Sequence, residues 1–309
     1  MISPNVLNSK RLGRPERRRA ASRARTVAGL LLLLVLAACS SDNDDDDGGP
    51  GPSPLPNVVN YTAIGASDAV GVGSSAPCLP FSSCPDGRGY VPLVARELRG
   101  DGKDVTLTNL GVPGFVLSPA VESLAEQYGR DIPGNFIQQE MPFVRSGATL
   151  VTIFAGGNDT NAIATAVDRG AGGSSVNAFI DAQVQSFAAD YVSLVEGIRQ
   201  RAGSPQIVVL NLPNFAGLPF TAGRSTTQRR WMQRISVGLS RAANALTAHD
   251  VRVVDIHCDA RAYQRSNYSS DGFHPSDAGY AFMANEVLDA VAAPPPPPEA
   301  DCSFSRIIP

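Results

Sequence analysis

Short runs of aliphatic and β-branched residues alternate with longer segments of helical periodicity along most of this chain, which strongly restricts its fold. Each run is almost continuously apolar, as expected for a strand buried on both faces of a sheet. Strands that alternate with helices form parallel sheets covered by helices on both sides. The expected strands are Val58–Ile64, Val105–Leu110, Thr149–Phe154, Gln206–Leu210 and Val251–Ile256, and the helical segments are roughly Gly89–Arg99, Asn135–Val144, Asn177–Arg201, Thr226–Ala248 and Ser276–Val291.

We therefore predict an α/β domain over residues 57–292, built as a three-layer α/β/α sandwich around a central, mostly parallel five-stranded sheet. In open sheets of this kind, ligands bind outside the carboxyl ends of the strands. The residues that directly follow each strand are therefore the first candidates for a functional site.

The N-terminus has the pattern of an export signal. Residues 1–38 carry eight of the 26 basic residues and a single acid, and they end in an apolar run from Ala28 to Ala38. A basic segment, a short apolar run and small residues are typical of a secretory signal peptide, and about a dozen apolar residues are too few to span a bilayer as a helix. The string Leu-Ala-Ala-Cys that ends at Cys39 looks like the lipobox of bacterial lipoproteins, so we expect Cys39 to be lipidated.

The residues after this cysteine indicate a membrane-tethered protein of the bacterial cell envelope. Residues 39–56 are rich in Asp, Gly and Pro, which favours an extended tether over a packed core. By resemblance to bacterial lipoproteins, Ser40 points to the outer membrane, on its periplasmic or surface face. Outside residues 1–38, acids outnumber bases by 28 to 18, so no basic face is available for phosphates and a nucleic-acid partner is disfavoured.

Four cysteines remain after Cys39 is set aside, and an exported protein meets an oxidising compartment. Two disulfides are therefore expected, with three possible connectivities. Closure of the short loop between Cys78 and Cys84 is the simplest pairing, and it would leave Cys258 to pin Cys302 and the Pro-rich tail of residues 293–309. No Cys-x-x-Cys or His-x-x-x-His spacing supports the rival interpretation as a metal site, and we expect neither a metal nor another cofactor.

Three of the predicted strands are followed by residues suited to a site. Ser67 follows Gly65 after the first strand, although a serine there is more often a helix cap than a nucleophile. Residues 109–114 (Asn-Leu-Gly-Val-Pro-Gly) expose backbone N–H groups, and a structural turn explains them equally well. Asn158 follows two glycines after the third strand, where a plain Asx turn is the alternative.

A fourth block follows the last strand and contains Asp271 and His274. Their spacing lets a single turn bring the carboxylate to the ring Nδ1, which would fix the tautomer and leave Nε2 free as a base. Among the three histidines, His257 is the one rival, because aspartates flank it, but its neighbour Cys258 ties it to a predicted disulfide.

Taken in order, these four blocks resemble those of the SGNH hydrolases, also called GDSL-type esterases and lipases. The resemblance covers nearly the whole predicted domain and implies an SGNH or flavodoxin-like fold with a triad of Ser67, His274 and Asp271. It also implies an oxyanion hole made by the N–H groups of Ser67 and Gly111 and the side-chain amide of Asn158. The Gly-Asp-Ser-Leu string reads Gly-Ala-Ser-Asp here, a departure that weakens inferences about substrate more than those about catalysis.

The expected activity is hydrolysis of carboxylic esters through a serine ester, with acyl or acetyl esters, lipids or acylated polymers as substrates. Residues 71–88 and 159–176 are the segments expected to shape the acyl pocket. The alternative is a surface lipoprotein that uses the same scaffold to bind a glycan or a partner without turnover. A periplasmic solute-binding protein is a third possibility, but the body is short for two lobes. The presence of all five site residues favours the enzyme.

Overall fold

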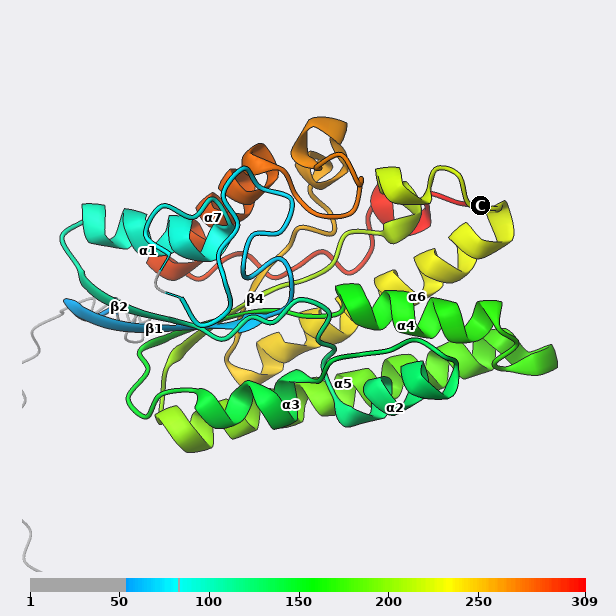
Figure 1. Ribbon diagram of the computed structural model, residues 1–309, viewed down its shortest axis with the longest axis horizontal. Helices are drawn as coiled ribbons and strands as arrows, with labels where there is room; N and C mark the ends of the chain where they lie inside the picture. The colour runs from blue at the N-terminus through cyan, green and yellow to red at the C-terminus, as the bar shows by residue number, and fades with distance from the viewer. Residues whose placement is uncertain (1–53, 83) are drawn as a thin grey trace, which may run out of the picture. The chain divides into compact units, whose positions relative to one another are not determined.

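The structure is a computed structural model that describes residues 54–82 and 84–309 (Figure 1). The predicted signal peptide, the lipidation at Cys39 and most of the predicted tether lie outside the described residues. Among the residues that are described, no helix is both long enough and apolar enough to cross a membrane.

A single sheet of five parallel strands forms the centre of the domain, in the order β2-β1-β3-β4-β5. The predicted α/β fold and its five-stranded sheet are thereby confirmed. The sheet places β1 and β3 at its middle, so the segments that follow these strands lie side by side. The strands are β1 (Val58–Gly65), β2 (Asp104–Asn109), β3 (Leu150–Phe154), β4 (Gln206–Leu210) and β5 (Arg252–Val254).

Both faces of the sheet are buried at its centre, where β3 and β4 are almost entirely apolar, whereas the edge strand β2 is partly exposed and alternates polar with apolar residues. In β4, Ile207 and Val209 belong to the core on one face, whereas Val208 and Leu210 belong to the core on the other. This two-sided burial explains why these central strands read as continuous apolar runs rather than as alternating patterns.

Helices α1 and α7 cover one face of the sheet, and α2 to α6 lie on the other (Figure 1). The long, predicted periodic segments form α5 and α6, and a capping box at Ser225 and Gln228 begins α6. The helices are α1 (Tyr90–Gly100), α2 (Pro119–Gln127), α3 (Phe136–Gln139), α4 (Gly157–Asp168), α5 (Val176–Ala202), α6 (Thr226–Asn244) and α7 (Asp277–Ala292).

Three segments differ from the sequence prediction, and the first of them is α2 (Pro119–Gln127), where no helix was predicted. The helix expected over residues 135–144 is broken into the short α3 and a 3-10 turn at Met141–Phe143, because Pro142 has no N–H for a continuing helix. No helix was predicted over residues 157–168, which form α4 and include the first half of the Gly- and Ala-rich segment 159–176, consistent with the high helix propensity of alanine.

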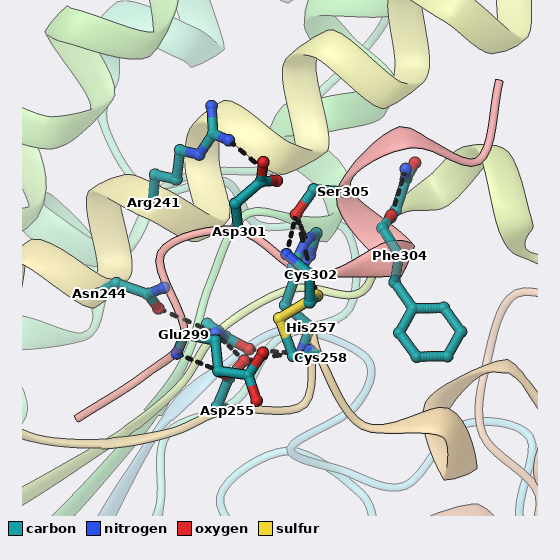
Figure 2. The surroundings of a disulfide bond; sticks show 12 residues. Arg241, Asn244, Asp255, His257, Cys258, Glu299, Asp301, Cys302, Phe304 and Ser305 are labelled. Atoms are coloured by element: carbon teal, nitrogen blue, oxygen red, sulfur yellow. Dashed lines mark hydrogen bonds and ion pairs between the residues drawn. A yellow bond between two sulfur atoms is a disulfide. The ribbon is translucent and has the colours of Figure 1, made fainter. Parts of the chain in front are cut away.

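The structure contains two disulfides, and they have the pairing expected if the short Cys78–Cys84 loop is closed first. Cys78 is bonded to Cys84, and Cys258 is bonded to Cys302. The second bond joins the segment after β5 to the C-terminal tail, and Figure 2 shows the polar contacts around it. Arg241 pairs with Asp301 at 3.7 Å on the α6 side of this junction.

The C-terminal tail is docked by side chains as well as by its disulfide. The buried His257 ring contacts the Leu212 carbonyl through Nδ1 at 2.9 Å. Through Nε2 it contacts the Ser305 hydroxyl at 3.0 Å (Figure 2). The Phe304 ring stacks on Tyr263 with a centroid distance of 4.3 Å. His257 therefore bridges the tail and the segment after β4, which accounts for its burial without a catalytic role.

Candidate active site

The first component of the site is the turn that follows β1. Ser67 lies two residues beyond the strand and is 5% exposed. A hydrogen bond from the Val72 N–H to the Ser67 carbonyl (2.9 Å) holds the turn closed. A Cβ on Gly65 would lie 3.0 Å from that of Ala69, so glycine permits the strand and the turn to approach closely.

A second turn, between β5 and α7, brings a histidine and an aspartate to this serine. His274 Nε2 lies 3.0 Å from Ser67 Oγ, and His274 Nδ1 lies 2.6 Å from Asp271 Oδ2. The turn is closed by a hydrogen bond from the Ser269 N–H to the His274 carbonyl (2.8 Å), and Gly272 adopts a φ of 71° within it. The structure therefore aligns Ser67, His274 and Asp271 in one hydrogen-bonded chain.

Hydrogen bonds favour the ionised form of Asp271. Partial burial by itself would raise the pKa of this carboxyl, but donation from His274, the Phe273 N–H and the Ser269 hydroxyl outweighs burial and holds the pKa well below its usual range. An ionised Asp271 keeps the proton of His274 on Nδ1, which leaves Nε2 to accept the proton of the Ser67 hydroxyl.

Aromatic packing fixes the position of the histidine ring. The Phe273 ring meets His274 edge-on at a centroid distance of 4.9 Å, and it also packs against Phe220 at 5.0 Å and Phe215 at 5.8 Å. On another side, Gly73 has a φ of 94°, and a Cβ there would lie 2.8 Å from the His274 Cβ. The ring is thus held between an aromatic cluster and the chain that leaves the nucleophile turn.

Asn158 reaches the same place from the first turn of α4. The helix begins after Gly156, whose φ of 106° turns the chain sharply at the end of β3. Asn158 Nδ2 donates one hydrogen bond to the Phe115 carbonyl (2.9 Å), and an amide nitrogen has a second hydrogen to donate. Asn158 and Ser67 line one small hollow together with Phe115 and Phe273.

Gly111 does not join these residues, which corrects the predicted oxyanion donor. Its N–H donates to Oδ1 of Asn109 (3.1 Å), and a Cβ there would lie 2.6 Å from that of Ala69, so this glycine serves close packing. Gly114, in the same loop, has a φ of 90°, and its N–H has no acceptor among the described residues. The Pro-Gly pair that ends this loop is the sequence signal for such a turn, and it adjoins the Phe115 carbonyl that Asn158 binds.

An apolar cavity, open in part to solvent, adjoins the hollow. Its walls come from the segments after β4 and β5 and from α7, not from the two segments that the sequence indicated. The residues that line both the hollow and the cavity are Asp68, Phe154, Gly157 and Phe273, and the apolar walls include Leu212, Phe215, Leu218, Ile256 and Met283.

Asp159 is buried directly behind the hollow and holds the loop that follows β2. Its Oδ1 accepts the Leu117 N–H at 2.9 Å, while Oδ2 has no partner among the described residues. Burial raises the pKa of Asp159 from 3.8 to about 7, against the opposing effect of hydrogen bonds from the N–H groups of Leu117, Asp159 itself and Gly156. The charge of Asp190 adds to the increase.

The substitution Asp159→Asn is expected to make the stability of the protein less sensitive to a rise in pH from 4 to 8. Between pH 3.8 and about 7 the carboxyl is neutral in the native state and ionised in the unfolded state, so the free energy of unfolding falls as pH rises through this window. The loss has an upper limit on the order of 4 kcal/mol. The side-chain amide oxygen of the variant would still accept the Leu117 N–H. We therefore expect the difference in Tm between the variant and the wild type to grow by several degrees, in favour of the variant, from pH 4 to pH 8. Calorimetry at each pH measures this difference. A constant difference across this range would contradict the expectation.

Three potential metal ligands lie within 4.8 Å of one another in the described part of the chain, namely His257, Cys258 and Cys302. Both sulfurs belong to the Cys258–Cys302 disulfide, and His257 is hydrogen-bonded through both ring nitrogens. A disulfide sulfur is not a thiolate, so in this oxidised form the cluster does not offer a metal its usual ligands.

The structure is thus a parallel α/β sandwich that carries Ser67, His274 and Asp271 in one hydrogen-bonded chain beyond the carboxyl ends of its strands. The chain belongs to the GDSL-like lipase/acylhydrolase family, whose sequence model matches residues 63–282. That span contains Ser67, Asn158, Asp271 and His274, and it supports an ester hydrolase of the lipase or esterase type.

Solved structures share the fold at low sequence identity. A lipase from a goat rumen metagenome is 20% identical with a TM-score of 0.54, and the match covers 76% of this chain and 98% of that one. The extracellular lipase of Streptomyces rimosus is also 20% identical with a TM-score of 0.53, over 75% of this chain and 99% of that one. No curated protein matches the sequence.

Proposed function

We propose that this protein is a serine esterase that hydrolyses carboxylic esters through an acyl-enzyme formed on Ser67. The observation that carries the proposal is the aligned chain in which His274 contacts Ser67 at 3.0 Å and Asp271 at 2.6 Å. Such alignment converts a weakly nucleophilic hydroxyl into one that can attack an ester carbonyl.

In the first half of the reaction, Ser67 Oγ bonds to the ester carbonyl carbon while its proton passes to His274 Nε2. Asp271 stabilises the resulting imidazolium. Collapse of the tetrahedral intermediate breaks the bond to the alcohol oxygen, which takes the proton from His274. In the second half, His274 removes a proton from water while the water oxygen bonds to the acyl carbon. Collapse of this second intermediate breaks the bond to Ser67 Oγ, which takes the proton from His274, and the products are the carboxylic acid and the free serine.

The negative oxygen of the tetrahedral intermediate needs hydrogen-bond donors near Ser67. The Ser67 N–H and the second N–H of the Asn158 amide are two such donors. Gly114 takes the role first given to Gly111, because its N–H has no acceptor within the described chain and it adjoins the carbonyl that Asn158 binds. Donors held in place before the reaction stabilise charge more strongly than water does.

Replacing Asn158 by alanine is expected to lower kcat by about two to three orders of magnitude, because one oxyanion donor typically contributes that much. Steady-state kinetics on a soluble p-nitrophenyl ester measures this, with Asn161→Ala on the same helix as the control. An undiminished kcat in a folded Asn158→Ala protein would exclude the amide from the oxyanion hole.

The acyl chain of the substrate is proposed to enter the apolar cavity beside the hollow. The two spaces share Phe154 and Phe273, and most residues that line the cavity are apolar, with Asp68 and Asn267 as exceptions, which suits a hydrocarbon chain. Rates on p-nitrophenyl esters from acetyl to palmitoyl test both the activity and this placement. The alternative, a lipoprotein that binds a glycan or partner without turnover, would be favoured by a folded protein that hydrolyses none of these esters and does not react with a fluorophosphonate.

We further propose that the protein is anchored by a lipid on Cys39 in the bacterial cell envelope. The lipobox-like string supports this, and so do the two disulfides, which are typical of proteins that leave the reducing cytoplasm. Mass spectrometry of the N-terminal peptide tests it: a chain that begins at an acylated Cys39 supports the anchor, and an unmodified cysteine within a longer chain would exclude it.

A further inference from the structure

The carboxyl group of Glu140 lies in the core beside the strand that leads to Ser67. Glu140 follows α3 and is 0% exposed. Its Oε2 accepts the backbone N–H of Gly65 at 3.0 Å, although 75 residues separate the two along the chain. Its Oε1 has no hydrogen-bond partner among the described residues.

Glu140 supplies an acceptor where the sheet no longer does. Gly65 is the last residue of β1, and its carbonyl accepts the Val112 N–H at 3.2 Å. The N–H and the carbonyl of one strand residue point to the same side, so the Gly65 N–H also points toward the β2 side of the sheet. The strand β2 has already ended at Asn109. A buried backbone N–H requires an acceptor, and the Glu140 carboxyl takes the position that a further strand residue would occupy.

This arrangement costs stability. Burial raises the pKa of Glu140 well above its usual range, although the N–H groups of Gly65 and Val112 act in the opposite direction. A carboxyl group with one unpaired oxygen is more expensive in a core than an apolar side chain of similar volume. A side chain that weakens the core while it contacts the nucleophile strand indicates a functional reason for its presence.

We propose that Glu140 is a positioning residue that fixes Gly65, and thereby the turn that carries Ser67, against the loop that begins at Val112. This proposal rests on the proposed esterase activity. Glu140 contacts neither Ser67 nor His274, and it acts by holding the backbone on which the nucleophile and the oxyanion donors are mounted. Because a misplacement of about 1 Å can reduce the rate roughly 100-fold, a single backbone hydrogen bond at this point can control turnover.

Two substitutions of similar size separate positioning from simple packing. Glu140→Gln keeps an oxygen that accepts the Gly65 N–H, so its kcat should stay within about threefold of wild type. Glu140→Met fills the same space without an acceptor, so its kcat should fall about 10- to 100-fold while KM changes by less than about twofold. The Tm of the methionine variant should equal or exceed that of wild type, because the buried carboxyl has been removed.

A merely structural role would give a different result. A folded Glu140→Met protein with the wild-type kcat would overturn the proposal, and so would a loss of kcat in Glu140→Gln as large as that in Glu140→Met. If the methionine variant does not fold, Glu140→Asp is the deciding variant, because its shorter side chain moves the carboxyl away from the Gly65 N–H. An unchanged kcat in Glu140→Asp would overturn the proposal, and a reduced kcat would support it. A wild-type protein that is inert on every ester would instead overturn the proposed function, and this inference with it.

Discussion

Ester hydrolysis by the Ser67→Ala protein is expected to fall about 10⁶-fold, because removal of the nucleophile from a Ser-His-Asp site has an effect of that size. The fold should persist. The Ser67 hydroxyl has a hydrogen bond to His274 at 3.0 Å, and losing one such bond costs about 1 kcal/mol. Activity should therefore disappear while the Tm changes by only a few degrees.

Initial rates on p-nitrophenyl butyrate and labelling by a fluorophosphonate would measure this loss by two independent routes. Ser74→Ala is a matched control, because Ser74 lies on the same segment and its hydroxyl donates to the Gly71 carbonyl at 2.7 Å, away from the histidine. Residual turnover in Ser67→Ala above about 1% of wild type would exclude Ser67 as the nucleophile and require another acceptor of the acyl group.

The sheet and the catalytic constellation were predictable because both depend on short-range patterns. A strand buried on both faces must be apolar, so the central strands β3 and β4 are visible in the sequence as almost continuous apolar runs. Parallel strands then place their carboxyl ends at one edge, which brings Ser67 and Asn158 together however far apart they are in sequence. Asp271 and His274 are three residues apart, so a local turn is sufficient to pair them.

The oxyanion loop was not predictable to the residue, because its hydrogen bonds depend on tertiary contacts. Two glycines in this loop, Gly111 and Gly114, are equally suitable by composition. The side chain of Asn109 folds back on the Gly111 N–H and also donates to the Ala69 carbonyl at 2.7 Å, which removes Gly111 from the site. That contact exists only once the turn after β1 has packed against the loop.

The buried position of Glu140 could not be predicted from the sequence for a related reason. In the sequence it is one polar residue in a segment with helical periodicity, and a polar residue there is ordinarily solvent-exposed. Pro142 ends the regular helix early, and the chain turns inward at a point where β2 has stopped short of β1. The need of the Gly65 N–H for an acceptor is a property of the assembled sheet and is not encoded in any local pattern.

Removing the Cys258–Cys302 disulfide by double substitution to alanine is expected to lower the free energy of unfolding by about 4 kcal/mol. The bond closes a loop with a sequence separation of 44 residues, and in the chain-entropy model the stabilisation grows with loop length. The same substitutions at Cys78 and Cys84, which are separated by 6 residues, should cost about 2 kcal/mol. Thermal or urea unfolding of the two variants measures the difference, which corresponds to several degrees in Tm.

The contacts of the tail make this prediction sharper. Gln233 binds both the N–H (2.9 Å) and the carbonyl (2.8 Å) of Ile308, and Asn214 donates to the Phe304 carbonyl at 2.8 Å. These contacts hold the tail even without the covalent bond. The Cys258/Cys302 double alanine variant should therefore be folded at room temperature and have a lower Tm than wild type. Asn214 adjoins Phe215, a wall of the apolar cavity, so kcat/KM should fall more for long acyl chains than for acetyl esters. Equal stability losses in the two double variants would show that loop length does not govern the contribution of these disulfides.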